Sequence, residues 1–313
     1  MGGTDSIVDQ GAVVLAGSYA GAGGNCRLVP MADSGTRVSQ LFDLSGRVAI
    51  VTGGAGLLGY HHGAILADAG AHVVLLDLAV ANPALRAAQL QAEHGPECLG
   101  IAADITSEES LLAARDEVVA KFGRVDILIN NAANNPKVEA DPQGEPKQWS
   151  RLENFPLSVW NADIAVGLTG AFLCSRIFGQ EMVKRNAGVI LNIASDLGVI
   201  APDQRLYRKE GVAEDQQPVK PVTYSVVKTA LIGLTRYLST YWTAHNIRVN
   251  AISPGGVAAG QPEEFTAKLH QLIPMGRMAH KDEYQGAILF LCSDASSYMT
   301  GQNLIVDGGR SVL

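Results

Sequence analysis

A tyrosine and a lysine stand four residues apart in the stretch KPVTYSVVKTALIGLTRYLS, which begins at Lys220. The apolar spacing predicts an amphipathic helix near residues 224–245, on which Tyr224 and Lys228 lie about one turn apart on one face. A phenol with a pKa of about 10 is a poor base at neutral pH, and a nearby ammonium favours its ionised form. The pair is therefore a candidate acid/base couple. The alternative is a packed tyrosine beside a solvated lysine.

The elements that must position this pair alternate between short apolar runs and helical patterns. The predicted strands are residues 48–52, 72–77, 98–103, 127–130, 189–193, 247–252 and 303–307. The predicted helices are residues 58–69, 84–94, 108–122, 160–185, 224–245 and 281–292. Apolar strands that alternate with helices indicate a parallel sheet covered on both faces. We therefore expect an α/β fold with a single Rossmann-type, doubly wound parallel sheet flanked by helices on both faces.

The first 43 residues differ in composition from the rest of the chain. They are small and Gly-rich, and the residues before their apolar stretch carry Asp5 and Asp9 but no lysine or arginine, unlike a secretory signal. We expect residues 1–43 to be a disordered or non-native extension, and residues 44–313 to form one domain with an insertion at about 203–221. No repeats occur, and no stretch approaches the long apolar run of a membrane-spanning helix.

The composition excludes several classes of protein. The net charge is −7, from 24 basic and 31 acidic residues, and no basic run suggests nucleic-acid binding. The four cysteines are far apart and form no C-x-x-C, so neither a zinc site nor a disulfide framework is indicated. The histidines show no ligand spacing, and we assign no metal. We expect a cytoplasmic protein without a membrane or nucleic-acid partner.

The stretch VAIVTGGAGLLG predicts a strand, a Gly-rich turn and a helix. Such a turn lets the backbone approach a pyrophosphate, and the helix N-terminus favours its negative charge. Asp77 ends the second predicted strand, where a carboxylate hydrogen-bonds adenosine ribose hydroxyls. No lysine or arginine in the turn or directly after Asp77 would hold a 2′-phosphate, so NAD is favoured over NADP. Asp104 and NNAA (130–133) follow the next two strands, although Asp104 also suits a capping turn.

With these motifs in this order, the chain resembles the classical short-chain dehydrogenase/reductase family over about residues 41–313. The other matching stretches are YSVVK, SPGG at 253–256 and MTGQNLIVDGG. The resemblance implies that Tyr224 exchanges a proton with substrate, Ser195 hydrogen-bonds the reacting oxygen, and Lys228 supports the phenolate and binds cofactor ribose. It also implies a homotetramer or homodimer packed through the helices near 160–185 and 224–245. The implied cofactor-binding residues are Gly53, Gly54, Gly56, Leu57, Leu58, Gly59, Asp77, Asp104, Ile105, Asn131, Ala132, Tyr224, Lys228, Pro254, Gly255 and Val257.

The chain departs from the family pattern in three places. Leu57 stands where the family usually has glycine, and we expect pyrophosphate binding to survive. Gly167 replaces an asparagine that supports a water-linked proton path from the lysine, although glycine keeps the backbone carbonyl that holds such a water. We expect Gly167 to loosen its helix locally. The third departure is the long segment between Ser195 and Tyr224.

The stretches VTGGAGLLG, VGLTGAFL and SDLGVIAPDQRLY also resemble oxidoreductases of bacterial nonulosonic (legionaminic or sialic-type) acid and flagellin-glycan pathways. This resemblance implies an NAD-dependent oxidoreductase that interconverts a secondary alcohol and a ketone on a sugar or sugar-phosphate derivative. The segment 203–221 would then help to form the substrate pocket, with Arg205 and Tyr207 as candidate substrate contacts. A solvated surface insertion is the alternative. Rival functions are a 3-oxoacyl reductase, a polyol or sugar-acid dehydrogenase, and a catalytically weak NAD-binding sensor or partner subunit.

Overall fold

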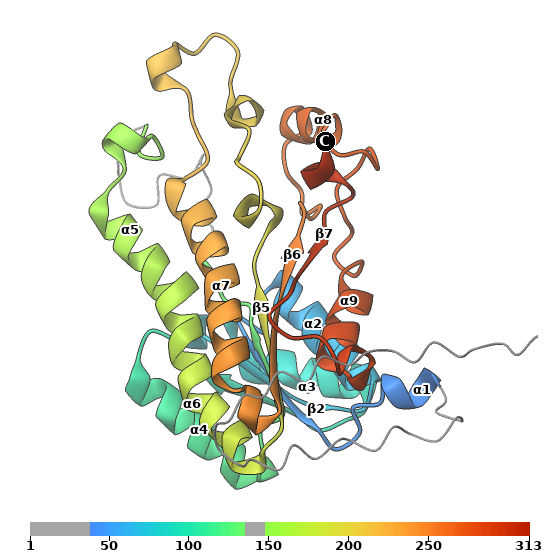
Figure 1. The fold of residues 1–313 in the computed structure, drawn as a ribbon. Coiled ribbons are helices and arrows are strands. Elements are labelled where there is room, and N and C mark those ends of the chain that lie inside the picture. Colours follow the sequence, from blue (N-terminus) through green and yellow to red (C-terminus); the bar gives the residue numbers. More distant parts are fainter. Residues whose placement is uncertain (1–37, 135–147) are drawn as a thin grey trace, which may run out of the picture. The chain divides into compact units, whose positions relative to one another are not determined.

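The computed structural model describes residues 38–134 and 148–313, which belong to the second of two units of the chain, residues 32–313. Seven strands in these ranges form one parallel sheet in the order β3-β2-β1-β4-β5-β6-β7 (Figure 1). Because β1 pairs with both β2 and β4, the strand order reverses there, and the crevice at this switch point is where open α/β sheets bind ligands. The strands are β1 Val48–Thr52, β2 His72–Asp77, β3 Cys98–Ala102, β4 Ile127–Asn130, β5 Gly188–Ile193, β6 Ile247–Pro254 and β7 Asn303–Val306.

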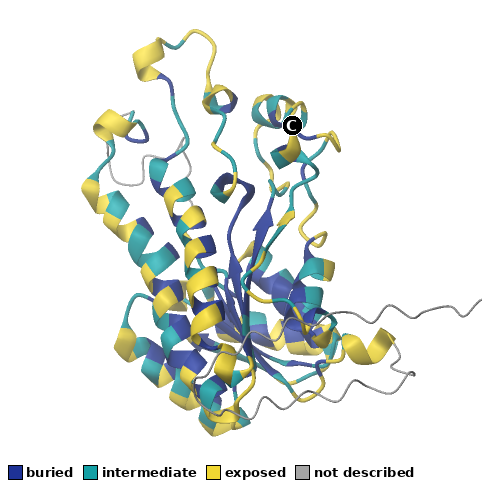
Figure 2. Cartoon of the chain, in the orientation of Figure 1, coloured by how far each residue is buried: buried dark blue, intermediate teal, exposed yellow. Residues whose placement is uncertain are grey.

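Alternate residues of the strands face two separate apolar layers. Ala49 and Val51 of β1 pack with α2, α3 and α9 on one face, whereas Val48 and Ile50 pack with α4, α6 and α7 on the other. The strands β1, β2, β4, β5 and β6 are therefore the most deeply buried elements (Figure 2), whereas β3 and β7 are mostly of intermediate exposure. This confirms the predicted doubly wound α/β fold. The helices are α1 Val38–Leu41, α2 Leu57–Asp68, α3 Pro83–His94, α4 Glu108–Phe122, α5 Leu157–Ile164, α6 Gly170–Arg185, α7 Val222–Tyr241, α8 Glu263–His270 and α9 Gln285–Cys292.

Three differences from the predicted elements matter for the site. The helix predicted over 160–185 begins at Leu157 and is divided by a π-helical turn, Ala165–Thr169. The helix α8 was not predicted, because its eight residues are mostly polar. The segment 203–221 contains two short 3-10 turns, Gln204–Tyr207 and Glu214–Gln216, rather than a structureless loop.

The run Leu157–Arg185 is long and apolar enough, by length and composition, to cross a membrane. The expectation that no stretch approaches this length was therefore wrong. The apolar residues of α6, among them Cys174, Phe178 and Met182, pack in the layer between the sheet and α4. This run is accounted for as a core helix of the α/β fold.

The predicted boundary at residue 43 lies at the edge of the described chain. Residues 1–37 lie outside the described residues, and so does the segment 135–147. Within the described part, α1 contributes no buried residue, and Leu44 is the first residue fully buried in the core. The division into an extension and a domain stays a prediction.

Candidate active site

The Gly-rich turn joins β1 to α2 at the switch point of the sheet. Gly53 has a φ of +61°, and a Cβ there would lie 2.9 Å from the Cα of Ala132. A Cβ on Gly59 would lie 2.2 Å from the carbonyl oxygen of Gly53. Neither position accepts a side chain, so the backbone at the N-terminus of α2 stays bare toward a ligand. Gly54 is equally crowded, with a Cβ 2.7 Å from the Val51 carbonyl, whereas Leu57 is exposed and Leu58 partly buried.

Asn131 and Ala132, directly after β4, hold this turn in place. The amide of Asn131 donates to the Thr52 carbonyl at 2.9 Å and to the Gly53 carbonyl at 3.2 Å. The backbone N–H groups of Asn131 and Ala132 both donate to the Thr52 hydroxyl, at 3.0 and 3.1 Å. The ends of β1 and β4 are therefore fixed to each other by four hydrogen bonds.

Asp77 lies at the end of β2, beside the turn. One carboxylate oxygen accepts from the backbone N–H of Ala55 at 3.0 Å, and the other accepts from its neighbour Leu78 at 2.8 Å. Each oxygen keeps capacity for a further donor, because a carboxylate accepts about four hydrogen bonds. A bare glycine cradle with a carboxylate at the end of the second strand fits a dinucleotide with free ribose hydroxyls.

Asp104 and Ile105 follow β3 but have local partners. The carboxylate of Asp104 accepts from the backbone and hydroxyl of Thr106, at 2.8 and 2.7 Å. The side chain of Ile105 is buried, and a Cβ on Gly170 would lie 2.6 Å from it. The capping-turn interpretation of Asp104 therefore matches the structure, and its cofactor contact stays a prediction.

The loop after β6 is fixed to the end of β7. The N–H of Gly255 donates to the Val306 carbonyl at 2.9 Å, and the Tyr284 hydroxyl donates to the Gly255 carbonyl at 3.0 Å. Val257 forms an isolated parallel bridge with Ala279. Pro254 thus ends β6, and Gly255 and Val257 lie in the loop that follows, at the same edge of the sheet as the Gly-rich turn.

Ser195, Tyr224 and Lys228 come together where β5 ends and α7 begins. Ser195 is buried and lies beside the Tyr224 phenol. The ammonium of Lys228 donates to the Ile193 carbonyl at 2.8 Å and lies 5.8 Å from the centroid of the Tyr224 ring. The close packing of the two elements requires Gly198, because a Cβ there would lie 2.8 Å from the carbonyl carbon of Lys228.

Burial governs the protonation of this cluster. It raises the pKa of Tyr224, because the phenolate is poorly solvated there. Burial, and then the charge of Lys220, lower the pKa of Lys228 to about 8. The phenolate that proton abstraction needs is thus unfavourable unless cations lie beside it. Two lysines provide them, since Lys220 also lies over the Tyr224 ring, with its nitrogen 3.9 Å from the centroid.

A match to a family model described as enoyl-(acyl carrier protein) reductase covers residues 55–311. The chain is 33% identical to a D-threitol dehydrogenase of Mycolicibacterium smegmatis, over 87% of this chain and 95% of that protein. The chain therefore belongs to the classical short-chain dehydrogenase/reductase family. An NAD-dependent glycerol dehydrogenase of Listeria innocua is also 33% identical, over 87% of this chain and 96% of that protein.

Among solved structures, a gluconate 5-dehydrogenase of Burkholderia cenocepacia in complex with NADP and tartrate is similar, with a TM-score of 0.76 and 28% identity. The similarity covers 88% of this chain and 100% of that one. As a member of the family, the chain is an enzyme: a nicotinamide-dependent oxidoreductase that acts on CH–OH groups.

Gly167 lies in the π-helical turn and faces α7. A Cβ there would lie 2.5 Å from a methyl group of Val227, the neighbour of Lys228. An asparagine at this place would collide with α7, so glycine and Val227 form a matched pair. The turn at Ala165–Thr169 is the local irregularity expected at Gly167, and its form is a widened helical turn rather than a break.

The two predicted substrate residues are placed differently. Arg205 is 79% exposed in its side chain and pairs with its neighbour Asp203 at 2.6 Å. Tyr207 packs on Phe265 of α8, with ring centroids 5.6 Å apart. Burial raises the pKa of Tyr207 to about 12, and charges on Arg310, Tyr224 and Asp196 act on it as well. Tyr207 therefore lies near the catalytic cluster, whereas Arg205 does not point a free charge there.

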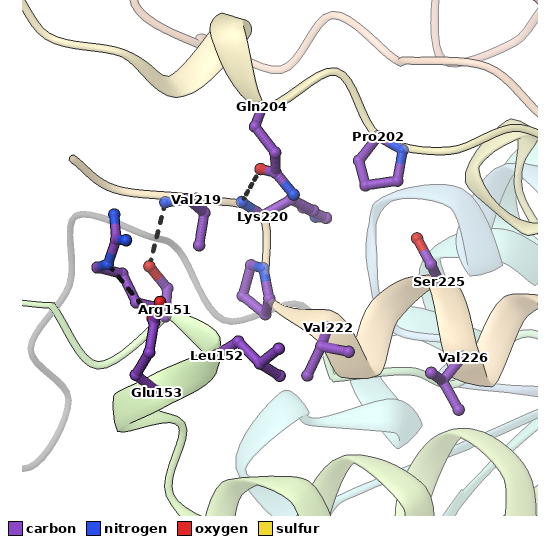
Figure 3. A pocket seen from close by; sticks show the side chains of 12 residues that line it. Arg151, Leu152, Glu153, Pro202, Gln204, Val219, Lys220, Val222, Ser225 and Val226 are labelled. Carbon is purple, nitrogen blue, oxygen red and sulfur yellow. Dashed lines mark hydrogen bonds and ion pairs between the residues drawn. The ribbon is translucent and has the colours of Figure 1, made fainter. Parts of the chain in front are cut away.

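A cavity of about 390 Å³ lies between the start of α7 and the segment Ser150–Glu153 (Figure 3). Gln204 crosses its edge and accepts a hydrogen bond from the backbone N–H of Lys220 at 2.8 Å. The hydroxyl of Ser225 in its wall is buried and has no hydrogen-bond partner among the described residues. The cavity borders Lys220, which also lies over the Tyr224 ring.

Sequence reasoning missed three residues of this cluster: Lys220 over Tyr224, and Asp196 and Arg310, which form a buried ion pair of 2.7 Å beside Ser195. A signal for Lys220 was its position directly before Pro221 and the helix that carries Tyr224. The signal for Asp196 was a carboxylate three residues after the end of an apolar strand and directly after Ser195. Nothing local marked Arg310, since its partner lies 114 residues earlier.

Proposed function

We propose that this enzyme is an NAD-dependent dehydrogenase that interconverts a secondary alcohol and a ketone on a polyol or sugar derivative, with Tyr224 as the acid/base group. The observation that carries the proposal is the grouping of Ser195, Tyr224 and Lys228 at the carboxyl edge of the sheet, with Ser195 and Lys228 buried. This edge also carries the Gly-rich turn and Asp77, so one crevice brings the reacting groups beside the dinucleotide cradle.

Each residue has a defined part in the reaction. When bound, the nicotinamide takes a hydride from the alcohol carbon or returns it to the ketone. Tyr224 accepts the alcohol proton at its phenolate oxygen, and in the reverse direction it donates that proton to the ketone oxygen. Lys228, held by the Ile193 carbonyl, contributes the positive charge that stabilises the phenolate. Ser195 orients the reacting oxygen.

The preference for NAD rests on Asp77. Its carboxylate would hydrogen-bond the ribose hydroxyls and repel a 2′-phosphate. The similar glycerol dehydrogenase is named as NAD-dependent, whereas the similar gluconate 5-dehydrogenase was solved with NADP, so the fold accommodates both. Asp77 supports NAD for this chain.

The polyol or sugar class rests on the relatives and on the substrate side of the site. Two similar proteins are named for threitol and glycerol, and a third for gluconate. The cavity beside Lys220 carries polar groups of Ser150, Gln204 and Ser225 that suit a hydroxylated molecule. Tyr207 and Arg205 lie outside this lining and remain candidate substrate contacts from the segment 203–221. A nonulosonic-acid precursor, which the stretch SDLGVIAPDQRLY favours, is a finer proposal of the same class.

We also propose a cytoplasmic homotetramer or homodimer.

The test is a substrate panel with NAD or NADP. It contains threitol, glycerol, galactitol, gluconate and sugar phosphates, and a 3-oxoacyl thioester is offered with each reduced cofactor. We expect reduced nicotinamide to appear with NAD and at least one polyol or sugar acid, and not in Tyr224→Phe. If the protein binds NAD but turns over nothing in the panel, the proposal fails in favour of a binding protein. Turnover of the thioester alone would favour the 3-oxoacyl reductase.

A further inference from the structure

The hydroxyl of Ser195 has a second acidic neighbour that the mechanism above does not use. Ser195 Oγ donates to Asp196 Oδ1 at 2.8 Å, because an ionised carboxylate can only accept. The backbone N–H of Leu197 donates to Ser195 Oγ at 3.2 Å and to Asp196 Oδ1 at 2.8 Å. The proton of Ser195 is therefore directed at Asp196 and away from Tyr224.

Arg310 holds the other oxygen of the same carboxylate. Its Nη1 donates to Asp196 Oδ2 at 2.7 Å, and the two side chains are 8% and 4% exposed. The position of Arg310 follows from the turn after β7, where Gly308 and Gly309 have φ of +68° and +90°. Asp307 closes this turn by accepting from the N–H groups of Gly309 and Ser311, at 2.9 and 2.7 Å.

We propose that the buried Asp196–Arg310 pair tunes the acid/base chemistry of the site, because Asp196 competes with Tyr224 for the proton of the Ser195 hydroxyl and Arg310 limits that competition. A phenolate at Tyr224 is stabilised when Ser195 donates to it. A bare carboxylate at Asp196 would keep that proton and also repel the phenolate. Arg310 neutralises the carboxylate and weakens both effects. Asp196 and Arg310 are thus positioning residues, acting through Ser195.

Other charged and titratable groups also face Tyr224 and set the background for this tuning. Burial raises the pKa of Tyr224, and the charge of Asp196 raises it further. The two lysines beside the ring are present in every variant below. The charge of Asp196 after β5 acts on Tyr224, Tyr207 of the segment 203–221 interacts with it, and Lys220 and Lys228 lie over its ring. Asp163 of α5 acts on Lys220, and Arg310 after β7 acts on Tyr207.

The proposal predicts opposite changes from the two halves of one ion pair. In Asp196→Asn the competing charge is gone, and Tyr224 should ionise about one pH unit lower than in the wild type. In Arg310→Met the carboxylate is uncompensated, and Tyr224 should ionise about one pH unit higher. Arg310→Lys should stay near the wild type. The double variant Asp196→Asn/Arg310→Met should not show the higher ionisation pH of Tyr224 expected for Arg310→Met, because that increase requires the Asp196 carboxylate.

The experiment is a titration of the full chain labelled with ¹³C at tyrosine Cζ, with and without NAD. The Tyr224 signal is identified by its loss in Tyr224→Phe. The titration needs no turnover, so it decides the inference even if the proposed substrate class, on which its relevance to catalysis rests, proves wrong. Where a substrate is found, the acid limb of kcat/KM for oxidation should move in the same directions.

A matched control is the Arg47–Asp294 ion pair, which has the same length of 2.7 Å but is more exposed and lies at the start of β1. Asp294→Asn should leave the Tyr224 titration unchanged. If Arg310→Met fails to fold, Asp196→Asn and the double variant carry the test, since neither contains an unpaired buried carboxylate. Titration of Tyr224 at the wild-type pH in Asp196→Asn, or shifts of the same sign in both single variants, would overturn the proposal.

Discussion

The Gly-rich turn after β1 and the segment 203–221 contribute to the same edge of the sheet, but they are held in different ways. The turn is fixed by backbone groups and by Asn131 of a neighbouring strand, with no space for a Cβ at Gly53 or Gly59. The segment 203–221 is held by exposed ion pairs such as Arg205–Asp203 and Arg208–Glu214, and by a small apolar cluster against α8.

This difference in how the two regions are held suits them to different functions, cofactor binding for the turn and substrate binding for the segment 203–221. A surface built from backbone and glycines recognises a feature common to all dinucleotides, and any added atom damages it. Exposed ion pairs contribute little stability, so their side chains are free to exchange partners for a ligand. We therefore expect substitutions in the turn to abolish cofactor binding, and substitutions in the segment 203–221 to change the substrate KM.

The largest effect should come from Gly59→Ala. The added Cβ lies 2.2 Å from the Gly53 carbonyl, so the turn must move away from its present path. We expect the Kd for NAD to rise by about 100-fold, which corresponds to the upper range of overpacking costs. Calorimetry measures it. The control is Gly233→Ala in α7, where no atom lies within 4 Å and no loss is expected. Equal affinities in both variants would show that the turn does not bind the cofactor.

The next effect is on the choice of cofactor. Asp77→Asn keeps an oxygen for the Ala55 N–H but removes the negative charge. We expect NAD to bind about tenfold more weakly, since hydrogen bonds to charged groups are worth about 1.5–3 kcal/mol, and the preference to shift toward NADP. Kd values for both cofactors are compared. A wild type that prefers NADP would contradict the assignment of Asp77.

A smaller effect separates two arginines of the segment 203–221. Arg205→Glu should raise KM for the true substrate about threefold to tenfold, as expected for loss of one hydrogen bond with a net contribution of about 1 kcal/mol, and leave the Kd for NAD unchanged. Arg208→Glu is the matched control, because Arg208 also forms an exposed ion pair within the segment. Equal KM values for the two variants would mean that the segment is a solvated surface, and Arg205 would lose its predicted role.

The smallest effect is on stability. Burial lowers the pKa of Lys220 to about 8, so the folded chain loses this proton before the unfolded chain does. The cost of burying the charge is present below pH 8 and is relieved as pH rises from about 8 toward the ordinary lysine value. In urea unfolding, the stability of Lys220→Met relative to wild type should therefore be greatest below pH 8 and fall above it. A difference independent of pH would show that Lys220 is not buried as a cation.

The same contrast explains what the sequence predicts. Strand ends, the Gly-rich turn and the Tyr224–Lys228 spacing are local patterns, and β1, β2, β4 and α4 begin and end where predicted. Contacts between distant side chains are not local. Arg310 reaches Asp196, and Lys220 bends back over Tyr224, only once the chain is folded. The positions of the candidate cofactor residues at the strand ends were therefore predictable, and the groups that surround the phenol were not.

The central claim is that Tyr224 exchanges the proton during alcohol oxidation. The direct measurement compares kcat/KM of wild type and Tyr224→Phe on the best alcohol of the panel, together with the Kd for NAD. The account predicts a fall in kcat/KM of at least about 10²-fold, the usual contribution of an acid/base group, with an unchanged Kd because the ring and Lys228 remain. Turnover by Tyr224→Phe at the wild-type rate would contradict it.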